Sequence, residues 1–375
     1  METAAAYIKR TLEERQIKGN YRKLTPESTL VDFYSNDYLG FARSVQLKTN
    51  IQEEVDNYRF ASNGSTGSRL LSGNSTYAEE LEAYLAGLHN CEAGLIFNSG
   101  YAANLGLFSS LPQKGDTIIL DEYIHASIID GARLSFANRY KFRHNDLESL
   151  EAKLKMAKGI CYVAVESVYS MDGDSPDLPG LINLTEKYSA NLIVDEAHAT
   201  GLFGFGLITD ELQDRVFARI VTFGKALGCH GAIILGSNLL KNYLINFARP
   251  FIYTTAPSFH QLVSIKNAYK ILLSSANMIN NLKNNINLFK LNIKSDNIFQ
   301  IIKSDSAIQS LVLKNNELAK EISGKLQNAG LEVKPVLSPT VAKGTERLRI
   351  CLHSFNNINE ITLLTDIINN LTHAG

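Results

Sequence analysis

The pattern of apolar and polar positions predicts one large sheet in the first three quarters of the chain. Short apolar runs alternate with stretches that have helical spacing, and the runs lie at residues 94–98, 117–120, 140–143, 160–166, 191–195, 219–223 and 231–235. Runs of this length between helical segments are typical of a mostly parallel sheet with helices on both faces. We therefore expect an α/β fold with a seven-stranded sheet.

The pattern changes in an Asn-rich segment at residues 277–297. Beyond it, three candidate strands (308–313, 331–336, 347–352) alternate with two candidate helices (316–328, 359–371), which is typical of a small α+β domain. The charged first 16 residues have a helical pattern, not that of a signal peptide. We predict an N-terminal segment at 1–44, a large domain at 45–275 and a small C-terminal domain at 276–375.

Composition and charge exclude several classes of protein. The 375 residues include 37 Lys and Arg against 38 Asp and Glu, and the sequence contains no long basic run. Nucleic acid is therefore not expected as the main partner. No apolar run approaches the ~20 residues that a membrane span needs, so we expect a cytoplasmic protein. The four cysteines, Cys91, Cys161, Cys229 and Cys351, lack metal-ligand spacing and are predicted to be buried free thiols, with no metal site.

Polar residues that close the apolar runs are the candidates for chemistry, because open parallel sheets bind ligands beyond the carboxyl ends of their strands. Asp195 closes one run, His198 follows it, and Lys225 comes after the next run. Taken singly, a helix-capping Asp and a solvated Lys are the ordinary explanations. Together they meet the needs of pyridoxal phosphate, whose aldehyde binds a lysine and whose ring nitrogen pairs with a carboxylate.

Three other runs end in groups that suit the same cofactor. Gly100 and Tyr101 stand at a strand-to-helix junction, where a helix N-terminus favours a phosphate. His125 follows another run and offers a flat ring for stacking, and Ser170, beyond Glu166, offers a hydroxyl for the phenolic oxygen of the cofactor. Turn geometry or a structural role would explain each of these residues alone.

Eight ordered segments resemble the α-oxoamine synthases, which are pyridoxal phosphate enzymes with the aspartate-aminotransferase fold. They are FYSNDYLG, NGSTGSRLLSG, FNSGYAAN, DEYIHASIIDGARLS, SVYSMDGD, VDEAHATG, TFGKALG and PTVAKGTERLRICLH. The resemblance implies that Lys225 is the Schiff-base lysine, that Asp195 pairs with the pyridinium, and that His125 stacks on the ring. It assigns to the cofactor the further residues Gly100, Tyr101, Ser170, His198, Thr222, Thr254 and Thr255.

The same resemblance implies substrate residues and a homodimer. The substrate residues are Arg22, Asn36, His125, Thr340 and Arg349, with Arg349 on the amino-acid carboxylate and Thr340 toward the acyl group. Thr254 and Thr255 match residues whose hydroxyls, in the family, contact the cofactor phosphate of the neighbouring subunit. The resemblance therefore implies a homodimer. This chain departs from the family at Pro257-Ser258, where Pro-Pro is common, and His230 receives no role.

Within the family, NGSTGSRLLSG and VTFGKALG favour the members that condense L-alanine with a pimeloyl thioester in biotin synthesis. CoA or an acyl carrier protein would carry the acyl group. One alternative is the condensation of glycine with acetyl-CoA, and another is a non-catalytic scaffold subunit on the same fold. A nucleotide-binding protein is disfavoured because the chain has neither GxGxxG after its first strands nor a GK[ST] phosphate loop.

Overall fold

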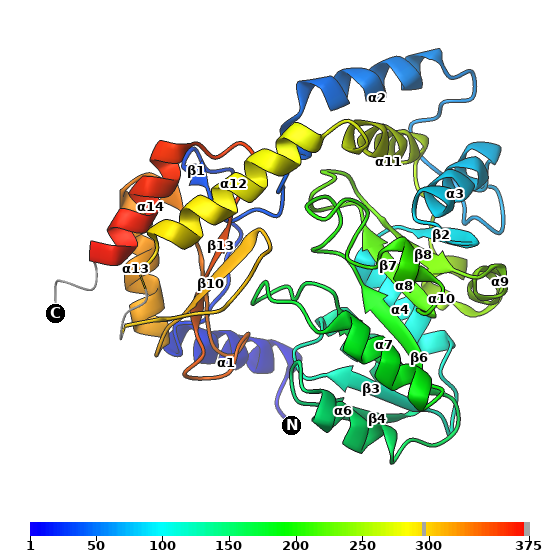
Figure 1. Cartoon of the computed structure of the whole chain (residues 1–375), viewed down its shortest axis with the longest axis horizontal. Coiled ribbons are helices and arrows are strands. Elements are labelled where there is room, and N and C mark those ends of the chain that lie inside the picture. Colours follow the sequence, from blue (N-terminus) through cyan, green and yellow to red (C-terminus); the bar gives the residue numbers. More distant parts are fainter. Residues whose placement is uncertain (295–297, 371–375) are drawn as a thin grey trace.

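A seven-stranded sheet forms the centre of the larger part of the molecule in the computed structural model, which describes residues 1–294 and 298–370 (Figure 1). Its strands are β2 (Ala93–Phe97), β3 (Thr117–Asp121), β4 (Asn138–Phe142), β5 (Cys161–Glu166), β6 (Asn191–Asp195), β7 (Ala218–Thr222) and β8 (Ala232–Gly236). Their order is β2-β8-β7-β6-β5-β3-β4, and β8 alone among them runs antiparallel to its neighbours. The mostly parallel seven-stranded sheet is therefore confirmed.

Helices cover both faces of this sheet because the side chains of each strand alternate between the two sides. Ile118 of β3 packs in one core cluster, with α4 (Gly100–Ser110), α5 (Ala126–Leu134), α9 (Asn238–Phe247) and α10 (Arg249–Ile252). The next residue, Ile119, packs in another cluster, with α6 (Leu147–Leu154) and α7 (Leu178–Lys187). α3 (Thr76–Leu88), α11 (Phe259–Leu272) and α12 (Ala276–Asn292) contribute to the largest cluster.

The C-terminal part contains a second, four-stranded sheet of order β12-β13-β10-β9. Its strands are β9 (Gln300–Ile301), β10 (Ile308–Val312), β12 (Pro335–Val336) and β13 (Arg347–Cys351), and α13 (Asn316–Asn328) and α14 (Ile358–Asn370) complete it. The predicted helix at 316–328 is confirmed, and α14 begins one residue earlier than predicted. Its predicted last residue, Leu371, and residues 295–297 of the Asn-rich segment lie outside the described residues. The domain boundaries at residues 44 and 275 stay predictions.

The single strand predicted at 331–336 is wrong. The segment forms two short strands that belong to different sheets: β11 (Leu331–Glu332) pairs with β1 (Val31–Asp32), while β12 pairs with β13. Between them Val333 is buried and donates its backbone N–H to the carbonyl of Leu331, which turns the chain. Pro335 has no N–H to continue a ladder. The residues before the large sheet are thereby joined to the C-terminal part through β1.

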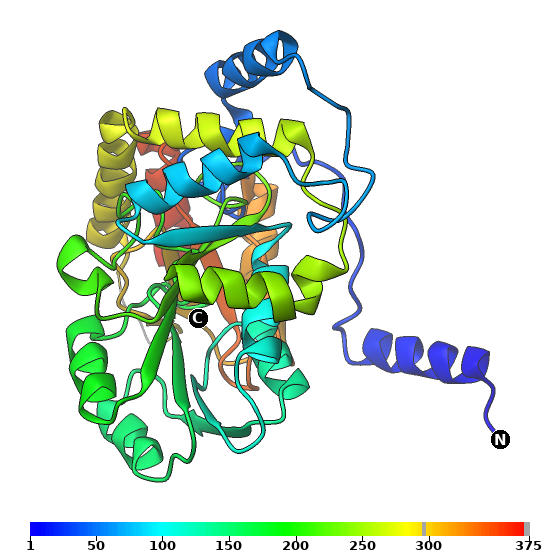
Figure 2. The same ribbon diagram turned by 90° about the vertical axis from the view of Figure 1, so that its right-hand side faces the viewer.

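The N-terminal helix predicted by the charge pattern is confirmed as α1 (Ala4–Ile17), whose cap Thr3 accepts a hydrogen bond from the backbone of Ala6. Figure 2 shows α1 projecting away from the rest of the chain, and none of its residues is buried. α2 (Val45–Asn57) and α8 (Asp210–Gln213) complete the α-helices of the described part. Within that part, every helix is too short or too polar to cross a membrane.

All four cysteines are free. Cys161 and Cys351 are buried as predicted, whereas Cys91 and Cys229 are only partly buried. No group of three or more His, Cys, Asp or Glu side chains that could hold a metal occurs among the described residues.

Candidate active site

A cavity of about 160 Å³ lies where β5, β6 and β7 end at their carboxyl edge. Six of the predicted cofactor residues line it: Gly100, Tyr101, His125, Asp195, Thr222 and Lys225. Asn104, Ser127, Glu166, Ala197 and Ile220 complete the lining. We call this space the inner cavity. Residues separated by more than a hundred positions meet here because the carboxyl ends of parallel strands share one edge of the sheet.

Lys225 follows β7 in a turn, not in a helix, and the turn closes with a hydrogen bond from the N–H of Gly228 to the Lys225 carbonyl. Its Nζ lies 2.7 Å from Nε2 of His198. Burial lowers the pKa of Lys225 to about 8, although the charges of Asp195 and Glu166 oppose the shift. A sizeable fraction of the Lys225 side chains is therefore uncharged and nucleophilic near neutral pH.

Asp195 ends β6 and is buried. Its Oδ1 accepts a hydrogen bond of 2.9 Å from the N–H of Ala197, and its Oδ2 accepts one of 2.8 Å from Asn104. The chain enters turns after Asp195, so this residue is not a helix cap. Asn104 was missed from the sequence, although a polar residue on the buried, apolar face of α4 was a signal for it.

Glu166 ends β5 in the same cavity, with only 2% of its surface exposed. Oε2 accepts a hydrogen bond of 3.0 Å from the N–H of Ser170, while Oε1 is buried without a hydrogen-bond partner. Burial, followed by the negative charge of Asp195, raises the pKa of Glu166 to about 8. Glu166 is therefore mostly protonated at neutral pH.

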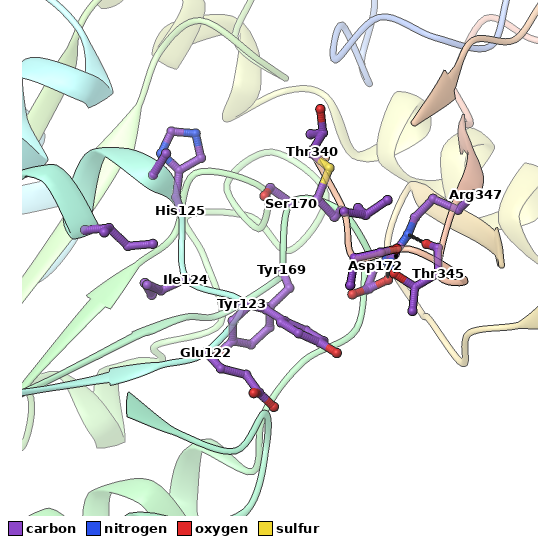
Figure 3. A pocket seen from close by; sticks show the side chains of 15 residues that line it. Glu122, Tyr123, Ile124, His125, Tyr169, Ser170, Asp172, Thr340, Thr345 and Arg347 are labelled. Carbon is purple, nitrogen blue, oxygen red and sulfur yellow. Dashed lines mark hydrogen bonds and ion pairs between the residues drawn. The ribbon is translucent and has the colours of Figure 1, made fainter. Parts of the chain in front are cut away.

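A second cavity of about 430 Å³ adjoins the first at His125, which lines both (Figure 3). We call it the outer cavity. Its lining includes the apolar residues Ile124, Ile129, Val341 and Ala342, together with Ser170 and Thr340. Arg347 and Asp172 form a buried ion pair on its wall. The guanidinium of Arg22 donates a 3.0 Å hydrogen bond to Thr340, so two predicted substrate residues meet at this cavity.

His144 packs behind the wall of the outer cavity. The sequence did not single it out. Nδ1 lies 2.9 Å from Asp121 and Nε2 lies 2.8 Å from Asp174. Burial opposes protonation, but the hydrogen bonds and charges of the two carboxylates raise the pKa of His144 to about 10. Tyr123 stacks on this imidazolium and Tyr169 meets it edge-on, and both tyrosines line the cavity.

Asn36 and Arg349 also meet, as the prediction of a shared role requires. Nη2 of Arg349 donates a 2.9 Å hydrogen bond to the side-chain oxygen of Asn36, and Nε donates one of 2.6 Å to the Ser170 carbonyl. Ser170 and His198 contact the inner cavity residues Glu166 and Lys225, respectively, without lining the cavity.

Thr254 and Thr255 lie outside both cavities of this chain. The side-chain amide of Asn98 donates a 3.2 Å hydrogen bond to the Thr254 hydroxyl and one of 2.8 Å to the Thr255 carbonyl. Ser258, at the departure from Pro-Pro, accepts a 3.2 Å hydrogen bond from the N–H of Gln261 and so caps α11. His230 is exposed, and its carbonyl accepts a hydrogen bond from Gln261.

The sequence model of the aminotransferase class I and II family matches residues 28–362. The chain belongs to this family. The 8-amino-7-oxononanoate synthase of Emericella nidulans is 40% identical over 394 aligned residues, which cover 96% of this chain and 94% of the relative. Membership confirms the predicted fold and the cofactor, pyridoxal phosphate.

Solved structures agree with this family. A Francisella tularensis structure of 8-amino-7-oxononanoate synthase superimposes with a TM-score of 0.77 at 30% identity, covering 92% of this chain and 99% of that one. The serine palmitoyltransferase of Sphingomonas wittichii gives a TM-score of 0.91 at 24% identity, over 100% and 99% of the two chains, which shows the shared fold.

Proposed function

We propose that this enzyme uses pyridoxal phosphate to condense L-alanine with a pimeloyl thioester, yielding 8-amino-7-oxononanoate, carbon dioxide and the free thiol in biotin synthesis. The observation that carries the proposal is the junction of two cavities at His125. One cavity gathers the residues that a pyridoxal phosphate ring needs, and the other offers a mostly apolar space for an acyl chain. Relatives that bear the name 8-amino-7-oxononanoate synthase cover nearly the whole chain.

The residues of the inner cavity fit pyridoxal phosphate. Oε1 of Glu166 and Oδ1 of Asn104 are buried acceptors without partners, as in a site built around a further group. Gly100 begins α4 at the edge of this cavity, and the N-terminus of a helix favours a phosphate. Lys225 would hold the aldehyde carbon and Asp195 the ring nitrogen, while His125 would stack on the ring. The protonated ring, when bound, withdraws electrons from the substrate α-carbon.

The chain's own groups divide the proton transfers. Lys225, with a pKa of about 8, supplies an amine that can bond to the aldehyde and, once displaced by the amino acid, can accept the α-proton. Asp195 would face the ring nitrogen, and the hydrogen bonds from Asn104 and the N–H of Ala197 fix its orientation. We propose that Arg349, with Asn36 beside it, pairs with the amino-acid carboxylate and fixes the face of the α-carbon.

The outer cavity is proposed to receive the acyl thioester. Each buried CH₂ of an acyl chain contributes ~0.8 kcal/mol, so an apolar lining favours pimeloyl over acetyl. The Arg347 charge is already paired with Asp172, and we propose Arg22, beside Thr340, as the cation for the distal carboxylate. Arg22 is exposed, so it can turn toward a ligand without breaking a buried ion pair.

We further propose a cytoplasmic homodimer. The loop that carries Thr254 and Thr255 packs on residues 65–73, with the N–H of Ala256 donating 2.9 Å to Gly67. Phe60, Leu71 and Tyr253, in and beside these two segments, are each more than 70% exposed. Large exposed apolar side chains gathered in this way are typical of a subunit interface. The free cysteines agree with a reducing compartment.

An assay of the purified, cofactor-loaded enzyme tests the proposal. L-alanine, glycine and L-serine are each paired with pimeloyl and acetyl thioesters, on CoA and on an acyl carrier protein. We expect product from L-alanine with pimeloyl and complementation of a biotin-requiring strain that lacks this step. Failure of both, together with rapid condensation of glycine and acetyl-CoA, would assign the enzyme to that other reaction.

A further inference from the structure

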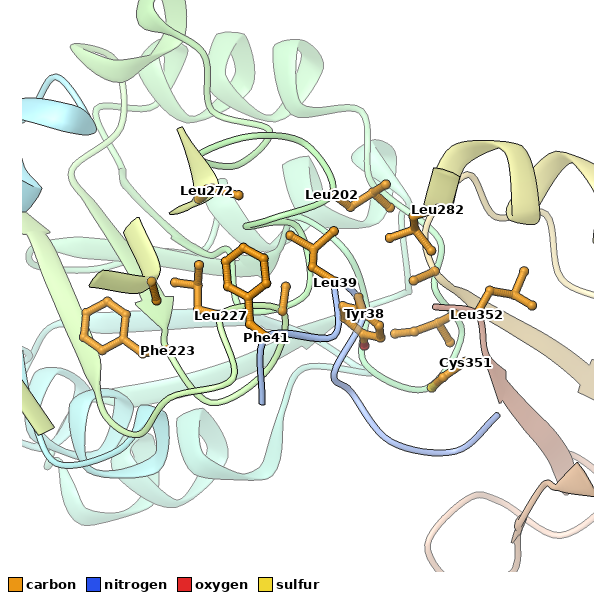
Figure 4. Packing of buried hydrophobic residues seen from close by; sticks show 14 of the residues in the cluster. Tyr38, Leu39, Phe41, Leu202, Phe223, Leu227, Leu272, Leu282, Cys351 and Leu352 are labelled. Carbon is orange, nitrogen blue, oxygen red and sulfur yellow. The ribbon is translucent and has the colours of Figure 1, made fainter. Parts of the chain in front are cut away.

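Tyr38 connects two groups of residues that the proposed function uses separately. Its side chain is 1% exposed and packs beside Leu39, Cys351 and Leu352, where the N-terminal segment meets the C-terminal part (Figure 4). Its hydroxyl lies 3.1 Å from Oδ1 of Asn36 and 2.8 Å from Nδ1 of His198. The ring is thus fixed by packing, and the hydroxyl stands between two hydrogen-bond partners.

These contacts continue in both directions. On one side, Arg349 donates 2.9 Å to the same oxygen of Asn36 and approaches the Tyr38 hydroxyl at 3.5 Å. On the other side, Nε2 of His198 lies 2.7 Å from Nζ of Lys225. An unbroken chain of side-chain contacts therefore runs from Arg349 to Lys225 through Asn36, Tyr38 and His198.

The Tyr38 hydroxyl has one proton to donate, and the neutral His198 carries one ring proton, on either Nδ1 or Nε2. The hydrogen bonds along this chain can therefore be arranged in two ways. Burial lowers the pKa of His198 well below its usual value, and burial raises that of Tyr38. In the first arrangement, Tyr38 donates to Asn36, Nδ1–H of His198 donates to Tyr38, and Nε2 accepts from Lys225, so a charged amine is accommodated. In the second, Tyr38 donates to His198, whose Nε2–H then faces an uncharged Lys225.

We propose that Tyr38 is a positioning residue that links the carboxylate pocket at Arg349 to the protonation of Lys225, by turning its hydroxyl between Asn36 and His198. A substrate carboxylate that takes the Arg349 donor leaves Asn36 with Tyr38 as its donor. Tyr38 then donates to Asn36, as in the first arrangement. In that arrangement Lys225 is a stronger base than in the second, and it can hold the α-proton. The pocket assignment rests on the proposed function, whereas the link from Tyr38 to Lys225 rests on the contacts alone.

Other charges around Lys225 act together with this link. Asp195 from the end of β6 favours the charged amine, and Glu166 from the end of β5 does so in its ionised form. Arg349 from β13 disfavours the charged amine, and His125 and His198, whose pKa values are lowered by burial, face the same space as neutral rings. Tyr38→Phe removes the hydroxyl and keeps the buried ring, and it leaves Asp195, Glu166 and His125 unchanged.

The test compares Tyr38→Phe with Tyr269→Phe. Tyr269 is fully buried, and its hydroxyl lies 2.8 Å from Nε2 of His89, so it is a matched tyrosine–histidine pair outside both cavities. The first readout is the pKa of Lys225 in cofactor-free protein, from the pH dependence of its acylation by acetic anhydride followed by peptide mapping. The second is the dissociation constant of L-alanine for the cofactor-loaded protein, from the change in cofactor absorbance.

In Tyr38→Phe we expect the Lys225 pKa to fall by about one unit, because His198 loses the acceptor that keeps its proton on Nδ1. L-alanine should bind about tenfold more weakly, because Asn36 and Arg349 lose their hydroxyl neighbour. Tyr269→Phe should leave both quantities unchanged. Unchanged values in Tyr38→Phe, a change in only one of them, or equal changes in both variants would overturn the proposal.

The wild-type product assay decides the proposed function separately. A wild type that makes no product from L-alanine and pimeloyl thioester, while Tyr38→Phe lowers the Lys225 pKa, contradicts the proposed reaction and leaves the link to Lys225 standing. A wild type that makes the product, with identical readouts in both variants, contradicts the link alone.

Discussion

Asn104 donates a 2.8 Å hydrogen bond to Oδ2 of Asp195 across 91 positions of sequence. The amide comes from the second turn of α4 and the carboxylate from the end of β6. The same amide nitrogen reaches the Ser127 hydroxyl at 3.0 Å. Asp195 therefore has a fixed orientation and a buried hydrogen-bond donor, which is what a partner for a protonated ring nitrogen needs.

Asp195→Asn keeps the shape of this residue and removes its charge. We expect exchange of the α-proton of L-alanine to slow by orders of magnitude while the cofactor still binds, because the ring is no longer held protonated. Exchange is measured by NMR in D₂O with the cofactor-loaded variant. Near-normal exchange with bound cofactor would refute the role of Asp195.

Lys225→Ala removes the amine from a cavity wall at little cost in packing. We expect a folded protein without turnover that still binds pyridoxal phosphate noncovalently. In the wild type, borohydride reduction followed by peptide mapping should label Lys225, and labelling at another lysine would contradict the assignment. Circular dichroism and thermal midpoint serve as controls for folding.

Arg22→Gln should weaken the enzyme for a pimeloyl thioester and leave an acyl donor without a distal carboxylate unaffected. The expected rise in KM for pimeloyl-CoA is about tenfold, which corresponds to one charge-assisted hydrogen bond. Lys23→Gln, which changes the adjacent exposed cation, is the matched control. An equal rise in KM with pimeloyl-CoA and with an uncharged acyl chain of the same length would show that Arg22 does not recognise the carboxylate.

Glu166→Gln should stabilise the cofactor-free protein at alkaline pH. The folded-state pKa of about 8 is raised from 4.5, so folding holds a proton that the unfolded chain releases. The wild type is therefore as stable as the variant below pH 4.5 and loses stability relative to it as pH rises toward 8, by on the order of 5 kcal/mol. Denaturant unfolding at pH 5, 7 and 9 measures this trend, with Glu148→Gln as the exposed control. A difference independent of pH would show that Glu166 is ionised in the fold.

His144→Gln should have a different pH profile. The pKa of His144 is raised from 6.5 to about 10 in the folded state, so its ion pairs contribute fully below pH 6.5 and are lost as pH rises through 10. We expect the variant to lose about 3 kcal/mol of unfolding free energy at pH 6 and much less near pH 10. The same loss at both pH values would mean that His144 is uncharged.

The sequence by itself determined the large sheet and the chemistry at its edge. Strand positions follow from local apolar runs, and Asp195 and Lys225 could be assigned to one site because Asp195 closes one run and Lys225 follows the end of the next. The edge of a parallel sheet brings these strand ends together whatever the details of packing. Gly100, Tyr101, His125 and Thr222 meet there for the same reason.

Only the tertiary structure decided the contacts between the N-terminal segment, the large sheet and the C-terminal part. Arg22 meets Thr340 across 318 positions and Asn36 meets Arg349 across 313, although the family resemblance had already grouped all four with the substrate. The division of residues 331–336 between two sheets depends on β1 and β13, which are distant in sequence. Tyr38, Asn104 and His144 stayed hidden because a polar side chain shows its role only through the partners that satisfy it when it is buried, and folding alone chooses those partners.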